Sequence, residues 1–171
     1  MSRGKEPAHL RMTAATSGAD IALRAVVESD LPIFFEHHRD PQSVAIAAFP
    51  ARDRAAHTLH WTKIMKDPST MLRTILSAGE IAGNIVSWDG ANGREVGYWI
   101  GRQFWGRGIA TRALALFLPE VRVRPLFAHV ARHNTASRRV LEKCGFVVAG
   151  AAGALSGPGQ EPVAEFILRL G

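Results

Sequence analysis

A glycine-rich segment at residues 105–111, Trp-Gly-Arg-Gly-Ile-Ala-Thr, has the residue types best suited to binding an anion. It follows a strand-like run at 95–100 and precedes a helical apolar pattern that begins at Ile109. A turn between a strand and a helix presents unpaired N–H groups and the positive end of the helix dipole, which suit a phosphate. Gly106 and Gly108 can adopt positive φ, and Arg107 between them adds a full positive charge.

The same segment is also compatible with a plain strand–helix turn that binds nothing, because short glycine loops are common. It is not a P-loop, since no Gly-Lys-Ser/Thr follows it. It is a poor dinucleotide fingerprint, because Ala110 follows the two glycines and no βαβ unit with a downstream acidic ribose ligand is evident. On these residues alone, the phosphate site and the plain turn both stay open.

Length and composition favour one globular domain. The chain has 171 residues, of which 47% are hydrophobic. We expect residues 1–19 to be a flexible leader and residues 20–171 to form the domain. No apolar run approaches the ~20 residues that cross a membrane, and the N-terminus lacks the apolar core of a signal peptide. The lone Cys144 excludes an intrachain disulfide, which fits a cytoplasmic protein.

The net charge of +6 comes mostly from dispersed arginines. Because no basic run is interleaved with aromatic residues, nucleic-acid binding is a minor alternative. A basic surface equally suits a polyanionic cofactor or an acidic substrate.

The hydrophobic periodicity predicts an α+β fold, in which a mixed sheet carries helices on both faces. Residues 42–50 receive no assignment, and a Gly/Pro-rich loop is expected at 153–162. The predicted strands lie at 21–26, 71–77, 81–88, 95–100, 126–130, 146–150 and 163–170, and the predicted helices at 31–38, 51–66, 109–119 and 135–143.

Two motifs resemble the GNAT superfamily of N-acetyltransferases. Residues 105–110 resemble its acetyl-CoA motif, Gln/Arg-x-x-Gly-x-Gly/Ala, with Trp105 at the first position. This departure resembles the branch of ribosomal-protein N-terminal acetyltransferases, where Gly-Tyr-Trp-Ile precedes Trp-Gly-x-Gly-x-Ala-Thr. This chain has Gly-Tyr-Trp-Ile at residues 97–100, followed by the second pattern at 105–111. Residues 133–146 resemble the family's Asn-x-x-Ser…Leu-x-Lys-x-Gly-Phe segment. The resemblance covers about residues 21–170.

The resemblance implies a sheet of about seven strands, flanked by about four helices and splayed between its fourth and fifth strands. It also implies acetyl-CoA as cosubstrate, with the pantetheine arm along the edge of the fourth strand and the pyrophosphate on the glycine loop. No metal is expected. The implied cofactor-binding residues are Trp99, Ile100, Gly101, Arg107, Gly108, Ile109, Ala110, Thr111 and Asn134.

Acetyl transfer needs a base for the amine and a proton donor for the CoA thiolate. Glu95, at the start of the predicted fourth strand, is the first candidate for the base, because a similar position carries the base in some relatives. The alternative is that Glu95 is only a solvated carboxylate at a strand end. His37, His38 and His133 are weaker candidates. Ser137 resembles the branch's serine and is either the proton donor or a residue that completes the helix cap.

The leading hypothesis is an acetyl-CoA-dependent N-acetyltransferase that acts by direct attack of a primary amine in a ternary complex. The amine is that of a protein N-terminus or of a small molecule, and relatives are monomers or homodimers. A second hypothesis is a non-catalytic acyl-CoA sensor, and a third is a basic nucleic-acid-binding protein. Membrane association is not expected.

Overall fold

A computed structural model describes residues 20–154 and 162–171. The predicted leader, and most of the predicted loop at 153–162, lie outside these residues. Seven strands and five α-helices are described, with 3₁₀ helices η1 (Glu28–Asp30) and η2 (Arg102–Phe104). The strands are β1 (Ile21–Arg24), β2 (Met71–Ser77), β3 (Glu80–Gly90), β4 (Gly93–Ile100), β5 (Leu126–Ala131), β6 (Val147–Ala154) and β7 (Val163–Leu170). The α-helices are α1 (Leu31–Arg39), α2 (Pro41–Ala47), α3 (Arg54–Met65), α4 (Ile109–Phe117) and α5 (Thr135–Lys143).

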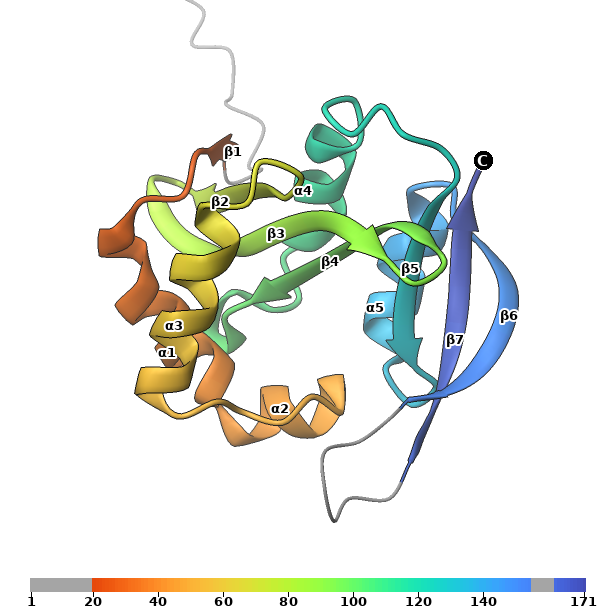
Figure 1. Cartoon of the computed structure of the whole chain (residues 1–171), viewed down its shortest axis with the longest axis horizontal. Coiled ribbons are helices and arrows are strands. Elements are labelled where there is room, and N and C mark those ends of the chain that lie inside the picture. The colour runs from red at the N-terminus through yellow and green to blue at the C-terminus, as the bar shows by residue number, and fades with distance from the viewer. Residues whose placement is uncertain (1–19, 155–161) are drawn as a thin grey trace, which may run out of the picture.

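All seven strands form one sheet in the order β1-β2-β3-β4-β5-β7-β6. The β4–β5 pair is parallel, and it is registered at only two positions, Arg94 with Leu126 and Glu95 with Phe127. Beyond these residues the two strands diverge (Figure 1). The α+β class and the splay between the fourth and fifth strands are therefore confirmed.

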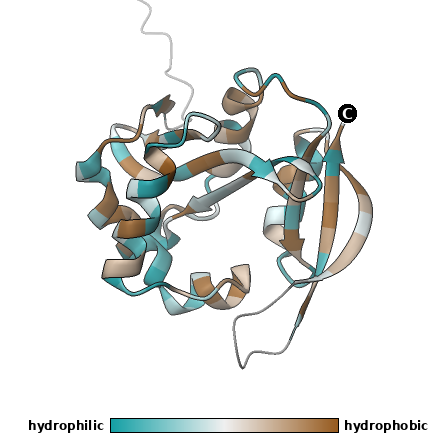
Figure 2. Cartoon of the chain, viewed as in Figure 1, coloured by the Kyte–Doolittle hydropathy of each residue, from teal (hydrophilic) through white to brown (hydrophobic). Residues whose placement is uncertain are grey.

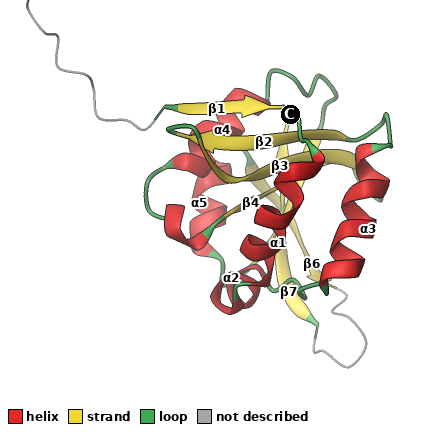
Figure 3. Ribbon diagram, turned by 90° about the vertical axis from the view of Figure 1, so that its left-hand side faces the viewer, coloured by secondary structure: helices red, strands yellow, loops and turns green. Residues whose placement is uncertain are grey.

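Helices cover both faces of the sheet (Figure 3). On one face Phe34 of α1 and Trp61 of α3 form a small apolar cluster. On the other face α4 and α5 close a larger core that includes Phe117 and Leu141. Figure 2 shows β7 as largely apolar, whereas the helices carry polar residues beside apolar ones, as expected for elements with one solvent-facing side.

The order of strands and helices is confirmed, with one addition. Residues 41–47, which the hydrophobic pattern left unassigned, form α2. Asp40 accepts a hydrogen bond from the Ser43 N–H at 2.9 Å, and Pro41 occupies the first turn. The Asp-Pro pair that ends α1 therefore also begins the next helix, because both residues favour a helix N-terminus.

Membrane-spanning helices and metal-binding clusters are both absent from the residues that the structure describes. None of the described helices is long and apolar enough to cross a membrane. No group of three or more His, Cys, Asp or Glu side chains within 20–154 and 162–171 is arranged to hold a metal ion.

Candidate active site

The glycine loop ends at an open helix N-terminus. Gly106 and Gly108 both have positive φ, +74° and +69°, and Gly108 is the N-cap of α4. No side chain caps α4. A Cβ built on either glycine would meet no atom within 4 Å. The first N–H groups of α4 therefore border open space, which is the arrangement that binds phosphate groups.

A cavity of about 520 Å³ adjoins this helix end. Its volume is in the range of sites that bind small molecules. α2, β4, the glycine loop, α4 and α5 all contribute to it. The lining residues are Ser43, Ile46, Ala47, Tyr98, Trp99, Ile100, Phe104, Trp105, Gly106, Gly108, Ile109, Ala110, Thr111, Asn134, Ala136, Ser137, Arg139, Val140 and Lys143.

The end of β4 exposes one backbone edge. The Gly101 N–H donates to Ala82 O at 2.9 Å and thus faces β3. Because peptide groups alternate along a strand, the N–H and C=O of Ile100 face the other way, toward the gap left by β5. The Trp105 indole N–H donates to Ile100 O at 2.9 Å. Of the expected edge at 99–101, Ile100 therefore presents its N–H outward.

Tyr98 and Ser137 meet inside the cavity. Their hydroxyl oxygens lie 2.8 Å apart, and the Tyr98 hydroxyl also donates to the Ser137 carbonyl at 3.1 Å. Burial raises the pKa of Tyr98 above its usual range, and the bond to Ser137 opposes this only in part, so the phenol stays protonated. Asn134 caps α5 by accepting the Ser137 N–H at 3.1 Å. Ser137 therefore contributes its N–H to the cap, while its hydroxyl contacts Tyr98.

Glu95 lies at the point where β4 and β5 part. It belongs to the last registered pair of these strands, and its side chain is only 13% exposed. Its neighbour Val96 is in the core under α4, so Glu95 faces the opposite side of the sheet. Its carboxylate lies over Gly90 of the β3–β4 hairpin, where a Cβ would stand 2.1 Å from Oε1. The place of this carboxylate thus requires glycine at position 90.

Three of the predicted site residues do not line the cavity: Glu95, Gly101 and Arg107. The Arg107 guanidinium lies 5.6 Å from the centre of the Phe104 ring. The weaker histidine candidates are engaged elsewhere. His37 and His38 pack in the α1 layer, where burial lowers the pKa of His38 to about 3, and His133 Nε2 lies 3.0 Å from Ala45 O.

Sequence reasoning missed the contribution of α2 and the basic end of α5. Ser43, Ile46 and Ala47 line the cavity from α2, a helix that the pattern did not predict. Arg139 and Lys143 line it from α5. Their spacing of four residues on a predicted helix places them on one face, and that signal was available in the sequence.

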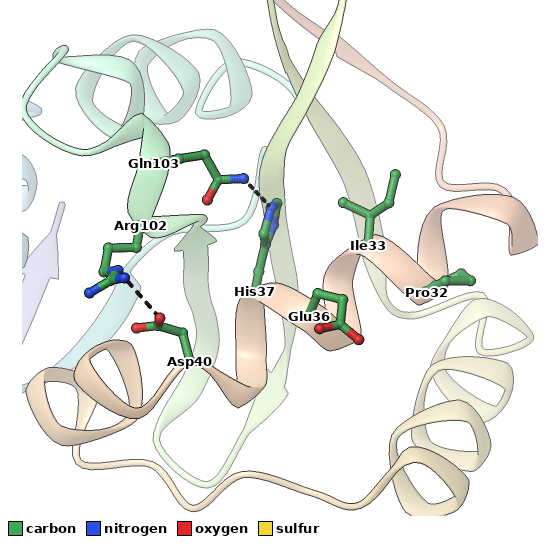
Figure 4. A pocket seen from close by; sticks show the side chains of 7 residues that line it. All are labelled: Pro32, Ile33, Glu36, His37, Asp40, Arg102 and Gln103. Carbon is green, nitrogen blue, oxygen red and sulfur yellow. Dashed lines mark hydrogen bonds and ion pairs between the residues drawn. The ribbon is translucent and has the colours of Figure 1, made fainter.

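A second cavity of about 560 Å³ lies where α1 meets η2 (Figure 4). Its charges are paired within the protein: Arg102 lies 3.3 Å from Asp40, and Glu36 pairs with Arg39 and Arg54. His37 Nε2 lies 3.3 Å from Gln103 Nε2. The glycine loop does not line this second cavity.

The sequence of residues 20–147 matches the domain family described as "Acetyltransferase (GNAT) domain". This chain belongs to the GNAT acetyltransferase family. It is thus an N-acetyltransferase by family, and the family's cosubstrate is acetyl-CoA. The residues of the first cavity fit such a cosubstrate, because the open end of α4 suits a pyrophosphate and Arg139 and Lys143 are its electrostatic complement.

Solved structures share the fold with this GNAT chain at low identity. Spermidine N-acetyltransferase from Vibrio cholerae, in complex with CoA and spermine, is 16% identical with a TM-score of 0.76, over 88% of this chain and 94% of that one. Mycobacterium smegmatis RimJ is 22% identical with a TM-score of 0.71, over 88% and 81%. RimL, a ribosomal alpha-N-protein acetyltransferase in complex with coenzyme A, is 16% identical with a TM-score of 0.72, over 88% and 93%. No curated protein sequence matches significantly.

Proposed function

We propose that this GNAT chain transfers the acetyl group of acetyl-CoA directly to a primary amine in a ternary complex. The observation that carries the proposal is the uncapped N-terminus of α4, which opens on a cavity bounded by β4, α4, α5 and α2. Such an end holds a pyrophosphate through main-chain N–H groups, and only glycine at positions 106 and 108 leaves that space free.

The chain would hold acetyl-CoA at two places, the pyrophosphate and the acyl group. The N–H groups of Gly108, Ile109, Ala110 and Thr111 are assigned to the pyrophosphate, with Arg107 close by and Asn134 beside the cofactor. The outward N–H of Ile100, between Trp99 and Gly101, is assigned to the acyl end. A backbone N–H at that position can polarise the thioester carbonyl and stabilise the oxyanion that forms on attack.

The proton movements are assigned to two groups. Glu95, on the sheet face opposite α4, binds the incoming ammonium and takes its proton, because the amine can attack only as a neutral group. Tyr98, with Ser137, protonates the departing thiolate. The raised pKa of Tyr98 supports this, since it keeps the phenol protonated until the sulfur leaves.

The acceptor we favour is a protein N-terminus, and a small-molecule amine is the second candidate. Support for the first comes from the Trp-Gly-x-Gly-x-Ala-Thr motif and from the fold likeness to RimJ and RimL. Support for the second comes from the fold likeness to spermidine N-acetyltransferase. Fold alone does not determine the acceptor.

A thiol-release assay tests the proposal. Acetyl-CoA is mixed with the protein and with a panel of N-terminal peptides, polyamines and amino acids. The proposal predicts that at least one amine speeds CoA release well above the rate without amine. The alternative, a non-catalytic acyl-CoA sensor, predicts tight acetyl-CoA binding and no amine-dependent release with any member of the panel.

A further inference from the structure

Three ionisable side chains form a row on the sheet face that carries Glu95. His129 Nε2 lies 3.8 Å from Glu95 Oε1, and His129 Nδ1 lies 3.3 Å from Glu165 Oε2. The row crosses three neighbouring strands in the order β4, β5, β7. Its members are partly shielded, with side-chain exposures of 13% for Glu95, 28% for His129 and 21% for Glu165.

The strand pattern places all three on one face. Ala128 and Val130, which flank His129, belong to the core under α4, so His129 faces the other way. Glu165 precedes Phe166, which also packs against that core. In register, Glu95 pairs with Phe127 and Glu165 pairs with Ala131, so His129 is the diagonal neighbour of both carboxylates.

The two contacts of His129 differ in kind. The 3.3 Å distance between Nδ1 and Glu165 is short enough for a hydrogen bond, and it favours the tautomer that carries its proton on Nδ1. Nε2 then presents a lone pair toward Glu95. The separation of 3.8 Å between Nε2 and Oε1 is too long for a direct hydrogen bond, and it leaves both atoms available to an intervening donor such as an ammonium or a water.

We propose that His129, oriented by Glu165, receives the proton that the acceptor amine loses at Glu95. This inference rests on the proposed function. One N–H bond of the ammonium breaks as its proton passes to Glu95 and on to His129 Nε2, and the neutral nitrogen forms the C–N bond before the C–S bond breaks. The second proton that the nitrogen loses on becoming an amide replaces the one that Tyr98 and Ser137 give to the departing thiolate. The imidazolium, beside the Glu165 carboxylate, returns the proton to water through its exposed edge.

The row of Glu95, His129 and Glu165 also predicts the charge of the acceptor. Two carboxylates flank one imidazole, so a cationic amine is attracted to this place and an anionic group beside the amine is repelled. A serine-protease triad uses the same division of labour, in which one carboxylate orients a histidine and stabilises its charged form. In this chain Glu165 is the positioning residue, and His129 is the group that touches the transferred proton.

The activity test compares His129→Gln and Glu165→Ala with wild type, using acetyl-CoA and two probes, spermidine and a pentapeptide that begins with alanine. We expect kcat for the better probe to fall by about 100-fold in His129→Gln, and by less in Glu165→Ala. Acetyl-CoA affinity by calorimetry should be unchanged in both variants. The matched controls are His60→Gln on α3 and Glu80→Gln at the start of β3, and both should keep the wild-type rate.

A spectroscopic test reports on orientation without turnover. Nitrogen NMR of labelled histidine should show His129 protonated on Nδ1 in the wild-type protein and shifted toward the Nε2–H form in Glu165→Ala. A wild-type ring protonated on Nε2 overturns the orientation. A full-rate His129→Gln enzyme overturns this inference alone, whereas a wild-type protein that acetylates neither probe overturns the proposed function and this inference with it.

Discussion

Tyr98 and Ser137 share one short contact, through which a proton can pass between the two hydroxyls. Tyr98 is the lone tyrosine of the chain, and its hydroxyl lies 2.8 Å from the Ser137 hydroxyl. The Ser137 hydroxyl can pass a proton on and recover one from the phenol. In the proposed mechanism the two hydroxyls act together as one proton donor, so removal of the phenol should lower kcat as well as remove packing contacts.

For Tyr98→Phe we expect kcat to fall by about 100-fold, because a general acid contributes at least that factor, with acetyl-CoA affinity unchanged. Ser137→Ala should show a loss of the same sign. Steady-state kinetics and calorimetry measure the two quantities. Thr58→Val, which removes an exposed hydroxyl on α3 that bonds the Arg54 carbonyl, is the control and should keep full activity. If both cavity variants also kept the wild-type kcat, the proton would come from elsewhere.

Gly90 offers a way to move the Glu95 carboxylate without changing its chemistry. A Cβ at position 90 would lie 2.1 Å from Glu95 Oε1, and a flexible side chain yields to such a contact more readily than backbone does. We expect Gly90→Ala to fold and to lose about 100-fold in kcat/KM, the cost of a displacement of about 1 Å in a catalytic group.

Two variants complete that experiment. Glu95→Gln should lose kcat/KM to a similar extent, with an unchanged Kd for acetyl-CoA. Gly150→Ala on β6 is the matched control, since a Cβ there meets nothing within 4 Å. Retention of full kcat/KM in both Gly90→Ala and Glu95→Gln would remove this carboxylate from the mechanism.

At the scale of elements, the site depends on how β4 is held at each end. At its start Arg94 donates to Ser87 Oγ at 2.8 Å and to Ser69 O at 2.6 Å, which fixes the hairpin beneath Glu95. At its end the Trp105 indole N–H bonds Ile100 O. Between these two anchored ends, β4 separates from β5 after two registered pairs. The hydrogen bonds at the two ends of β4 therefore hold it in place along the gap between β4 and β5.

α2 is the element that sequence reasoning could not supply. Its seven residues include no strong apolar period, and its boundary signals, Asp40 and Pro41, are equally those of a break. Tertiary contacts hold α2 in its position. His133 Nε2 contacts Ala45 O, 88 positions away in the sequence, and Ser43 is buried beside the cavity. Contacts of that range have no signature in a local pattern.

The glycine loop and the succession of strands and helices along the chain, by contrast, could be predicted, because each depends on local rules. Positive φ at Gly106 and Gly108 follows from the turn between strand and helix, and the alternation of 95–100 follows from burial on one face. The Glu95–His129–Glu165 row was not predictable. It depends on register across three strands, and a shift of one residue would turn each side chain to the other face.

At the scale of the whole molecule, a contact between buried His57 and half-buried His38 couples stability to pH. His38 Nδ1 lies 3.2 Å from His57 Nε2 between Trp61 and Trp99. Burial lowers the pKa of His38 to about 3 and that of His57 to about 4. Since both values lie below the unfolded value near 6.5, the unfolded chain binds more protons between these limits.

The stability that these neutral rings contribute should therefore be complete above about pH 6.5 and should be lost as the pH falls toward 4 and 3. We expect the Tm of the wild-type protein to drop between pH 7 and pH 5. The double variant His38→Gln/His57→Gln should show a shallower slope over this interval, whatever its Tm at pH 7. Scanning calorimetry measures the slope, and equal slopes in the two proteins would contradict the assignment.

The whole mechanism depends on acetyl-CoA being held by the main-chain N–H groups at the start of α4, and calorimetric titration of Gly108→Val tests this binding mode. The matched control is Gly79→Val in the β2–β3 hairpin, since Gly79 also has positive φ, +83°, and open space around it. Backbone strain of about 1 kcal/mol is common to both variants. We expect wild type and Gly79→Val to bind acetyl-CoA alike, while Gly108→Val loses about 100-fold in affinity, the worth of about two hydrogen bonds to a charged phosphate. Wild-type affinity in a folded Gly108→Val protein would contradict this binding mode.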